Sequence, residues 1–319
     1  MNTKEDKMHV GGQAVIEGVM MRSPEAVSVA VRKTDGKIVY QKRPFISFSK
    51  KSKLGGLPII RGAIILIESL VLGMQALSFS SEVAIEEENE KHSDTKRKKA
   101  TNKDGNFGQK LLMTITFIMA IGIGLALFFY LPLTLTHFLG LESGILFNFI
   151  DGIIRLIIFL LYIYTISMWK EIKRVFEYHG AEHKSIKAFE NKEELTVEAA
   201  QKYTTMHPRC GTSFLLVVVI VSIFVFVFLG KPSSPVDPVV LARLALVPLI
   251  AGLSYEVTRF SDRNQKNPFL KLIIAPGLWL QKITTREPDD QQIEVAYIAL
   301  KTALGEDVSQ LAEAYTQSS

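Results

Sequence analysis

The sequence predicts an α-helical polytopic membrane protein with about four transmembrane helices, a small N-terminal β-rich cytoplasmic region and interfacial helices. The first observation is the length of its uncharged segments, since residues 111–131 and 213–229 contain no charged side chain. A hydrocarbon core about 30 Å thick is crossed by roughly 20 such residues in a helix. The second observation is a single cysteine among 319 residues, which cannot form a disulfide within the chain. A soluble cytosolic enzyme, a disordered chain and a secreted disulfide scaffold are therefore excluded.

Residues 1–56 are expected to form the β-rich cytoplasmic region. The segments 27–31 and 37–41 are typical of strands, and Asp35-Gly36 between them suits the positive φ angles of a tight hairpin. Residues 10–21 are apolar and compatible with β-structure, so we expect a short antiparallel sheet. The first residues lack the apolar core of a signal peptide, so we expect no cleaved signal.

Residues 57–80 are long enough for a span, but they contain Arg61 and Glu68. A fifth span would also invert the charge pattern derived below, so we predict an interfacial or re-entrant helix on the cytoplasmic side. Arg61 and Glu68 are then either a functional pair inside the membrane or the wet side of a surface helix, and we favour the wet side. Residues 81–110 are predicted to be a charged linker, and residues 86–105 within it lack apolar periodicity and are expected to be disordered.

Residues 111–256 are predicted to form the membrane domain. The four spans are expected at 111–131, 152–169, 213–229 and 239–255. Arg155 and Arg243 lie near the ends of two of these spans, from which long cationic side chains snorkel to the membrane surface.

The distribution of lysine and arginine predicts the orientation of these spans. The loop 132–151 contains neither residue, whereas the loop 170–212 contains eight of them. Positively charged loops stay on the cytoplasmic side, so we expect a multi-pass protein of the cytoplasmic membrane with both termini and the loop 170–212 in the cytoplasm. Contacts with anionic lipid headgroups explain much of the net charge of +5, and no nucleic-acid-binding motif is present.

Residues 257–319 are predicted to form a cytoplasmic and interfacial region. The apolar segment 268–283 is interrupted by Pro276-Gly277, which favours an interfacial segment over a further span. Pro288 then opens a helix with apolar residues at helical spacing. The chain has no internal repeat, which argues against many classes of transporter.

The loop 170–212 contains an H-x-x-E-H pattern formed by His179, Glu182 and His183. Residues i and i+4 share one face of a helix, so both imidazoles can reach one metal ion. Glu182 lies on the flank of that face, where it can act as a general base toward a water molecule. Inverzincin metallohydrolases use the same spacing.

Two further residues extend this pattern to a site of four candidate ligands. His207 and Cys210 lie in a turn, with the two-residue separation of a ligand pair. We therefore predict a divalent metal, zinc by preference, bound by His179, His183, His207 and Cys210. If one of these is not a ligand, a water molecule can take its place and the site becomes catalytic.

Glu17 is a second candidate catalytic carboxylate, because it lies in an otherwise apolar strand. Arg22 is its candidate partner, and Gln13 is expected on the same strand face. The alternative is a strand edge with Glu17 pointing to solvent.

The candidate ligands also have a structural interpretation. His179 and His183 continue an apolar stripe of their helix and can simply pack there, while Cys210 can be a small buried residue. The protein is then a non-enzymatic membrane accessory or scaffold protein, or a small-solute carrier, with structural histidines.

Four motifs resemble the YqhQ-like family, a family of bacterial membrane proteins of unknown function described as predicted metal-dependent enzymes. They are GGQAVIEGVMMR at 11–22, EYHGAEHK at 177–184, HPRCGTSF at 207–214 and GLWLQKITTREPDDQQIEVA at 277–296. The resemblance implies an integral membrane protein with a cytoplasmic metal site, but no substrate. The residues that match the family's motifs by position are His179, Glu182, His183, His207, Cys210, Gln13, Glu17 and Arg22.

The leading hypothesis is a membrane-embedded metal-dependent hydrolase of the zinc type, with its site at the cytoplasmic membrane face. Glu182 acts as the base, and Glu17 lies nearby. A site at that depth suits an amphiphilic substrate or a cytosolic segment of a membrane protein.

Overall fold

The computed structural model describes residues 10–93, 105–232, 237–264 and 267–317. The chain forms two compact units. The first contains residues 1–89, 165–217 and 251–319, and the second contains residues 90–164 and 218–250.

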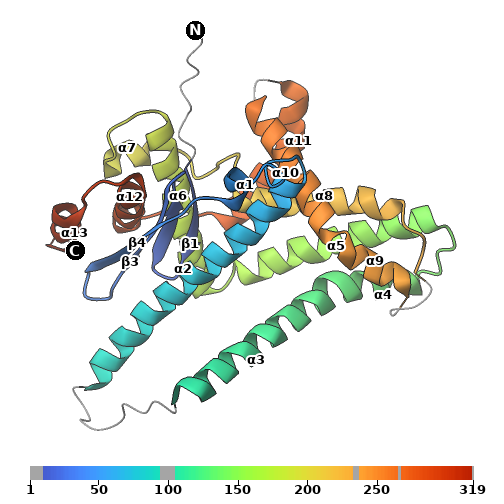
Figure 1. Ribbon diagram of the computed structural model, residues 1–319, viewed down its shortest axis with the longest axis horizontal. Coiled ribbons are helices and arrows are strands. Elements are labelled where there is room, and N and C mark those ends of the chain that lie inside the picture. The colour runs from blue at the N-terminus through green and yellow to red at the C-terminus, as the bar shows by residue number, and fades with distance from the viewer. Residues whose placement is uncertain (1–9, 94–104, 233–236, 265–266, 318–319) are drawn as a thin grey trace. The chain divides into compact units, whose positions relative to one another are not determined.

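The first unit is built on an antiparallel four-stranded sheet of order β1-β2-β3-β4 (Figure 1). The strands are β1 (Gly11–Val15), β2 (Gly18–Arg22), β3 (Ala26–Arg32) and β4 (Ile38–Pro44). The expected N-terminal sheet is confirmed. In the β3–β4 turn Gly36 has a φ of +88°, a conformation that glycine adopts without steric cost.

One face of the sheet packs on α6 (Lys170–Glu190) and α12 (Asp290–Leu304). Alternate strand residues such as Val19, Met21 and Ala30 join the core formed by these two helices. Helix α12 begins with a capping box between Asp289 and Gln292 and ends at Gly305 in the left-handed conformation. The helix expected after Pro288 is therefore confirmed.

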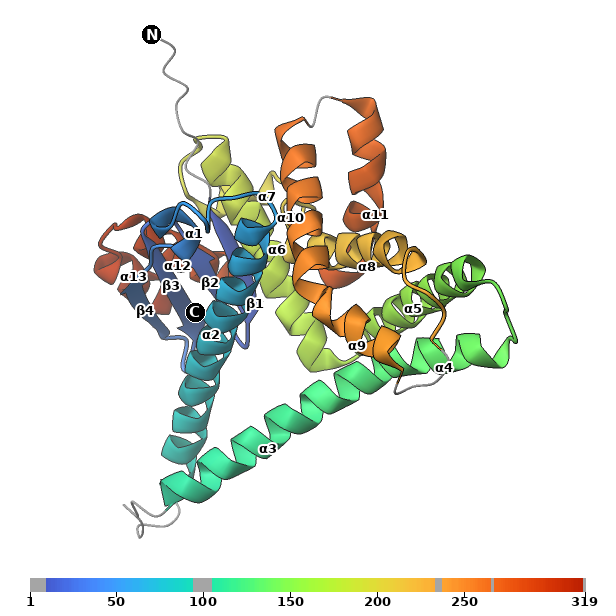
Figure 2. The ribbon, with the colours of Figure 1, turned by 45° about the vertical axis from the view of Figure 1, so that its right-hand side comes forward.

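The opposite face of the sheet packs on α2 (Ile60–Ser93) (Figure 2). This helix is continuous, with no re-entrant turn, and it runs well past residue 80, where we expected it to end. Residues 81–93 are thus helical instead of linker, since Val83 packs on the sheet while Glu82 and Glu86 are exposed. Helix α3 begins at Gly105, so only residues 94–104 of the predicted linker lie outside the described residues.

Short helices complete the first unit. They are α1 (Phe48–Lys51), α7 (Val197–Gln201), α11 (Pro268–Thr284) and α13 (Ser309–Gln317). The apolar segment around Pro276-Gly277 is one helix with Pro276 inside it.

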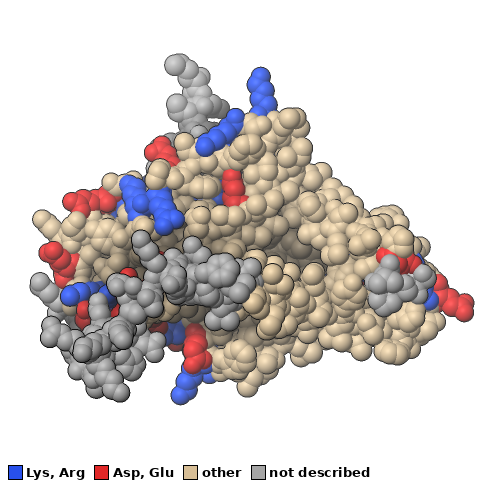
Figure 3. All heavy atoms as spheres, turned by 60° about the horizontal axis from the view of Figure 1, so that its bottom comes forward, with Lys and Arg blue, Asp and Glu red and all other residues tan. Residues whose placement is uncertain are grey.

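The remaining helices carry most of the uncharged sequence. They are α3 (Gly105–Leu125), the π-helix η1 (Ala126–Tyr130), α4 (Leu131–Phe138), α5 (Gly144–Ile166), α8 (Gly211–Val227), α9 (Pro238–Ala245) and α10 (Val247–Arg263). Within the second unit, the described surface over residues 115–138 has few charged side chains (Figure 3).

Among the described residues, four helical segments are long and apolar enough to cross a membrane: Ile60–Glu87, Ile115–Phe138, Gly144–Ile166 and Pro238–Arg263. The structure thus has four candidate spans, as predicted, but they are not the same four segments. Helix α8, expected to be a span, has 17 residues and is shorter, whereas α2 meets the criteria of length and composition.

The second unit encloses a charged cluster that we did not expect. Arg155 and Arg243 were predicted to snorkel, but both are buried and share the carboxylate of Asp151, at 2.8 Å and 3.4 Å. Asp151 lies inside α5, one turn before Arg155, and not in a loop as predicted. Because this acidic partner is available, neither arginine needs to reach water.

Candidate metal centre

Helix α6 places the H-x-x-E-H pattern in the interior of the first unit. Its backbone runs close to the segment after α11, where the Arg286 amide donates to the Phe176 carbonyl at 2.9 Å. Gly180 allows this approach, because a Cβ there would collide with the Arg286 carbonyl oxygen. Glu182 and His183 are consequently 5% and 1% exposed.

Three of the four candidate ligands meet at one point. One ligand atom from each of His179, His183 and Cys210 lies within 4.8 Å of the other two. Within this group, His179 Nε2 lies 3.1 Å from Cys210 Sγ. Cys210 directly precedes α8 and is buried, so the structure brings the turn before α8 next to the two histidines of α6.

Both imidazoles are oriented by backbone carbonyl groups. His179 Nδ1 lies 2.7 Å from the Thr284 carbonyl oxygen, and His183 Nδ1 is hydrogen-bonded to the Thr205 carbonyl oxygen. These bonds place the proton on Nδ1 and leave each Nε2 as an acceptor, which is the usual arrangement around metal-binding histidines. His183 Nε2 is buried and has no hydrogen-bond partner among the described residues.

The surroundings of His183 and Cys210 shift their pKa values toward the protonation states that bind a metal ion. Burial lowers the pKa of His183, so its imidazole is neutral at pH 7. Burial raises the pKa of the Cys210 thiol, but the neighbouring His183 and Thr212 lower it by more, so that the net shift is downward. Two imidazole nitrogens and a readily ionised thiol form a donor set that fits zinc.

Glu182 lies beside this cluster with an unusually protected carboxyl group. Its Oε2 is buried and has no hydrogen-bond partner among the described residues. Burial raises the pKa of Glu182 to about 8, and Cys210 adds to this rise, whereas His179 and a hydrogen bond from the Gly12 amide oppose it. A carboxyl group with a pKa near neutrality can both accept and donate a proton.

His207 is near the cluster but is oriented differently. Its ring centroid lies 5.5 Å from that of His183, but its Nδ1 accepts a hydrogen bond from the Arg209 amide at 3.3 Å. Its Nε2 therefore carries the proton and lies 3.6 Å from Glu190. Burial lowers the pKa of His207 to about 4. This prediction stays untested, and the structure does not include His207 among the three converging ligands.

Glu17 lies in the β1–β2 turn with a φ of +52°, and not inside a strand as predicted. Its carboxylate forms an ion pair with Arg174 and accepts a hydrogen bond from the Tyr178 hydroxyl at 3.3 Å. Arg22, its expected partner, pairs instead with Glu68 at 3.6 Å on the other face of the sheet.

Gln13 also points away from the site, against Gly73 of α2. The alternation of side chains along β1 explains the difference, because Gly12 faces Glu182 and the next residue must face α2.

Several residues that shape the site were not identified from the sequence. Thr205 and Thr284 act through their backbone carbonyl groups, which every residue has, so their side chains do not reveal this role in the sequence. Gln281 holds the His207 turn by accepting from the His207 amide and donating to its carbonyl, both at 2.7 Å. It lies in the GLWLQKI segment, which we interpreted only as a membrane-surface segment.

The comparison with known proteins agrees with the motifs. A family model described as "Protein of unknown function (DUF1385)" matches residues 57–306. The chain belongs to this family. It is 36% identical over 287 residues to the "Uncharacterized protein YqhQ" of Bacillus subtilis (strain 168), which covers 90% of this chain and 89% of that protein. The predicted resemblance is thereby confirmed. No solved structure matches the chain, and membership of the DUF1385 family assigns no reaction.

Proposed function

We propose that this DUF1385 protein is a membrane-embedded metal-dependent hydrolase, with His179, His183 and Cys210 as the ligands of a divalent metal ion, zinc by preference. The observation that supports the proposal is the pair of carbonyl-bound imidazoles whose Nε2 atoms converge on one buried thiol. Simple packing of histidines does not require both rings to present an acceptor nitrogen to the same sulfur atom.

Three protein ligands are typical of catalytic zinc sites, which leave one position for water or substrate. A bound zinc ion supplies Lewis acidity toward the bond to be hydrolysed. Glu182 has the burial and the raised pKa that suit a general base, so we assign to it the proton of the attacking water molecule. Glu182 then returns this proton to the leaving group.

The remaining site residues hold this arrangement in place. The Thr205 and Thr284 carbonyls fix the imidazole rings, and Gln281 fixes the turn that leads to Cys210. Glu17 fixes the start of α6 through Arg174, so we propose for it a positioning role instead of a catalytic one.

The site belongs to the cytoplasmic side of the cytoplasmic membrane in this proposal, with both chain termini on the same side. The support is the arginine and lysine content of the loop 170–212, which contributes both α6 and the turn before α8. This location favours a substrate that is itself held at the membrane, either an amphiphile or a cytosolic segment of a membrane protein.

The test is the metal content of the full chain, purified in detergent without a histidine tag. We expect about one equivalent of zinc in the wild-type protein and a loss of most of it in His179→Ala and in His183→Ala. His137→Ala is the matched control, because His137 is an exposed histidine of α4. Unchanged metal content in both site variants, or no metal in the wild-type protein, would refute the proposed site and favour structural histidines.

A second measurement tests the role of Glu182 as general base independently of metal binding. Glu182→Gln is expected to retain the metal and to lose hydrolysis of a membrane-derived substrate panel, with folding verified by the unchanged thermal midpoint of the metal-loaded form. Full activity of Glu182→Gln would eliminate Glu182 as the base while leaving the metal site intact.

A further inference from the structure

Helix α2 has the length and composition of a span, but it packs along the sheet. Glu68 pairs with Arg22, Ala76 and Val83 join the core on this face of the sheet, and Glu87 accepts a hydrogen bond from the Thr34 amide at 2.6 Å. These contacts extend over about 28 Å of helix, at roughly 1.5 Å per residue.

A membrane-crossing α2 would carry the sheet into the hydrocarbon core. Strand β4 is the edge of the described sheet, and its outer half contains the polar residues Gln41, Lys42 and Arg43. An open sheet edge leaves backbone N–H and C=O groups that hydrocarbon cannot satisfy. Helix α2 must therefore lie along the membrane or away from it, and not across it.

The side of α2 that faces away from the sheet is apolar and exposed. We call the side chains of Ile67, Leu70, Val71, Met74 and Leu77 the outer stripe; they are between 41% and 62% exposed. Their spacing of three and four residues places them on one face of the helix. A continuous apolar face of this kind marks a surface that is covered in the working protein.

The segment before α2 indicates that lipid covers the outer stripe. This segment exposes four apolar side chains, those of Ile46, Phe48, Leu54 and Leu57. Three exposed lysines, Lys50, Lys51 and Lys53, lie among them. Glu68 ties this segment to α2 by accepting from the Phe48 amide at 2.6 Å and from the Ser47 hydroxyl at 2.8 Å. Exposed apolar residues interleaved with lysine are typical of insertion into an anionic bilayer surface.

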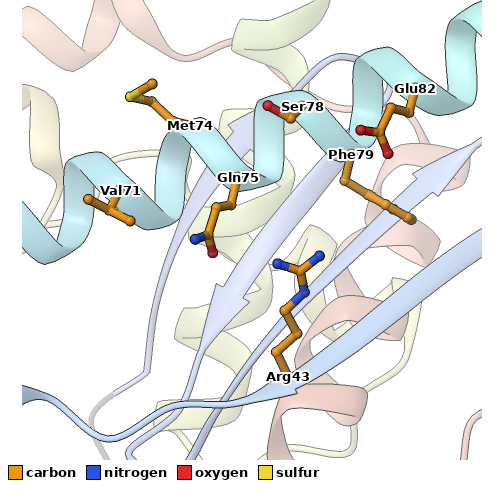
Figure 4. A pocket seen from close by; sticks show the side chains of 7 residues that line it. All are labelled: Arg43, Val71, Met74, Gln75, Ser78, Phe79 and Glu82. Atoms are coloured by element: carbon orange, nitrogen blue, oxygen red, sulfur yellow. The ribbon is translucent and has the colours of Figure 1, made fainter. Parts of the chain in front are cut away.

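A groove beside the outer stripe places a further cation at the same surface. It has a volume of about 330 Å³ and includes Val71 and Met74 of the stripe. Figure 4 shows Arg43 reaching from β4 toward Gln75 and Phe79 of α2. Arg43 thus lies beside the apolar side chains of Val71, Met74 and Phe79, in a groove that also contains Gln75, Ser78 and Glu82.

The start of α2 is joined to α10 by an ion pair. Gly62 packs against Gly252 of α10, where a Cβ would lie 2.9 Å from the Gly252 Cα atom, and Arg61 pairs with Glu256 at 2.7 Å. Glu256 lies about two helical turns before the end of the candidate span Pro238–Arg263. A charged pair costs far less at the membrane surface than in the hydrocarbon core, so this pair favours an interfacial position for the start of α2.

We propose that α2, together with residues 46–57, lies in the plane of the membrane interface and buries its outer stripe among lipid acyl chains, while lysines 50, 51 and 53 contact anionic headgroups. The proposal rests on the chain being a membrane protein and does not depend on the metal site. An experiment that refutes the interfacial position of α2 therefore leaves the proposed metal site untouched, and the reverse also holds.

The test is the immersion depth of nitroxide labels attached to the full chain in phosphatidylcholine–phosphatidylglycerol vesicles. Single cysteines replace Ile67, Leu70, Met74 and Leu77 in turn, and power saturation with oxygen and a nickel chelate gives each depth. The unmodified chain is the background control, because its one cysteine is buried. Ile157, Leu161 and Tyr164, which are exposed on α5, serve as reference positions on a candidate span.

We expect one shallow depth at all four α2 positions, within a few ångströms, and a progressive change of depth along α5. A change of about 15 Å between positions 67 and 77, at roughly 1.5 Å per residue, would show that α2 crosses the membrane and overturn the proposal. Labels that oxygen and lipid do not reach would equally overturn it, because the outer stripe would then be covered by protein.

A second variant tests the headgroup contact. The triple change Lys50→Gln, Lys51→Gln and Lys53→Gln is combined with a label at Phe48. In the wild-type background, added phosphatidylglycerol should draw the label deeper, and the triple variant should lose this response. An unchanged response in the triple variant would eliminate the lysines as the anionic-lipid contact.

Discussion

Gly12 on β1 packs directly against the Glu182 side chain on α6. A Cβ at residue 12 would lie 2.9 Å from the Glu182 carboxyl carbon and 2.7 Å from the Met20 carbonyl oxygen of the neighbouring strand. The Gly12 amide also donates a hydrogen bond to the Glu182 carboxylate. The GGQAVIEG motif therefore reaches Glu182 through a glycine backbone, whereas the Glu17 side chain contacts Arg174 and Tyr178 of α6.

Gly12→Ala is expected to lower stability by about 1–3 kcal/mol, the usual range for overpacking a well-packed interior. The methyl group must displace either the strand backbone or Glu182. Thermal unfolding in detergent measures the effect. Gly11→Ala is the matched control, since a Cβ at Gly11 meets nothing within 4 Å, and it should stay within about 0.5 kcal/mol of the wild-type value. Equal midpoints for both variants would show that residue 12 has room for a side chain.

Glu182→Gln is expected to change the pH dependence of the metal-free protein. Burial raises the pKa of Glu182 to about 8 from its ordinary value of 4.5, so the folded state favours the protonated carboxyl. This contribution to stability is fully present below pH 4.5 and is lost as the pH rises through 8. The thermal midpoint of chelator-treated wild-type protein should therefore fall relative to that of Glu182→Gln as the pH rises from 4.5 to about 8. Parallel curves for the two proteins would show that Glu182 is ionised at neutral pH without a metal.

Cys210→Ser is expected to weaken metal binding and to flatten its pH dependence. Metal displaces the thiol proton, so the affinity of the wild-type site should fall by up to about tenfold per pH unit below the pKa of the thiol. The serine hydroxyl has no such proton to lose near neutrality. Competition with a chromogenic chelator between about pH 6 and 8 measures both slopes. An identical slope in Cys210→Ser would exclude the thiolate as a ligand.

The local parts of this structure could be predicted from the sequence. The period-two strands around Asp35-Gly36 and the i, i+4 histidines both express geometry within one element. The prediction that α2 ends at residue 80 was wrong because tertiary packing extends the helix. Val83 packs on the sheet, and this contact stabilises helix in a charged segment whose composition alone does not favour it.

The partners of charged residues could not be predicted in the same way. Arg22 was chosen for Glu17 because it is near in sequence, yet the actual partner, Arg174, lies 157 positions away. The Thr284 carbonyl that orients His179 lies 105 positions away. Such pairings depend on how the sheet and α6 are stacked, which no local pattern encodes.

The second unit offers a prediction about its buried charges. Asp151 is shared by Arg155 and Arg243, and the Arg243 side chain also contacts Asn148 and lies 5.2 Å from the ring of Phe226. Asp151→Asn leaves two buried guanidinium groups without a counter-charge. Breaking a buried pair in this way costs about 3–5 kcal/mol.

We therefore expect Asp151→Asn to reduce the thermal midpoint and the yield of folded protein strongly. Glu193→Gln is the matched control, because it removes a carboxylate from a solvent-screened ion pair with Lys202 at 3.1 Å and should leave the thermal midpoint nearly unchanged. If the two variants unfold at the same temperature, the arginines are solvated in the folded protein, as snorkelling side chains would be. A large difference shows that Asp151 is required to hold two cations inside the helical unit.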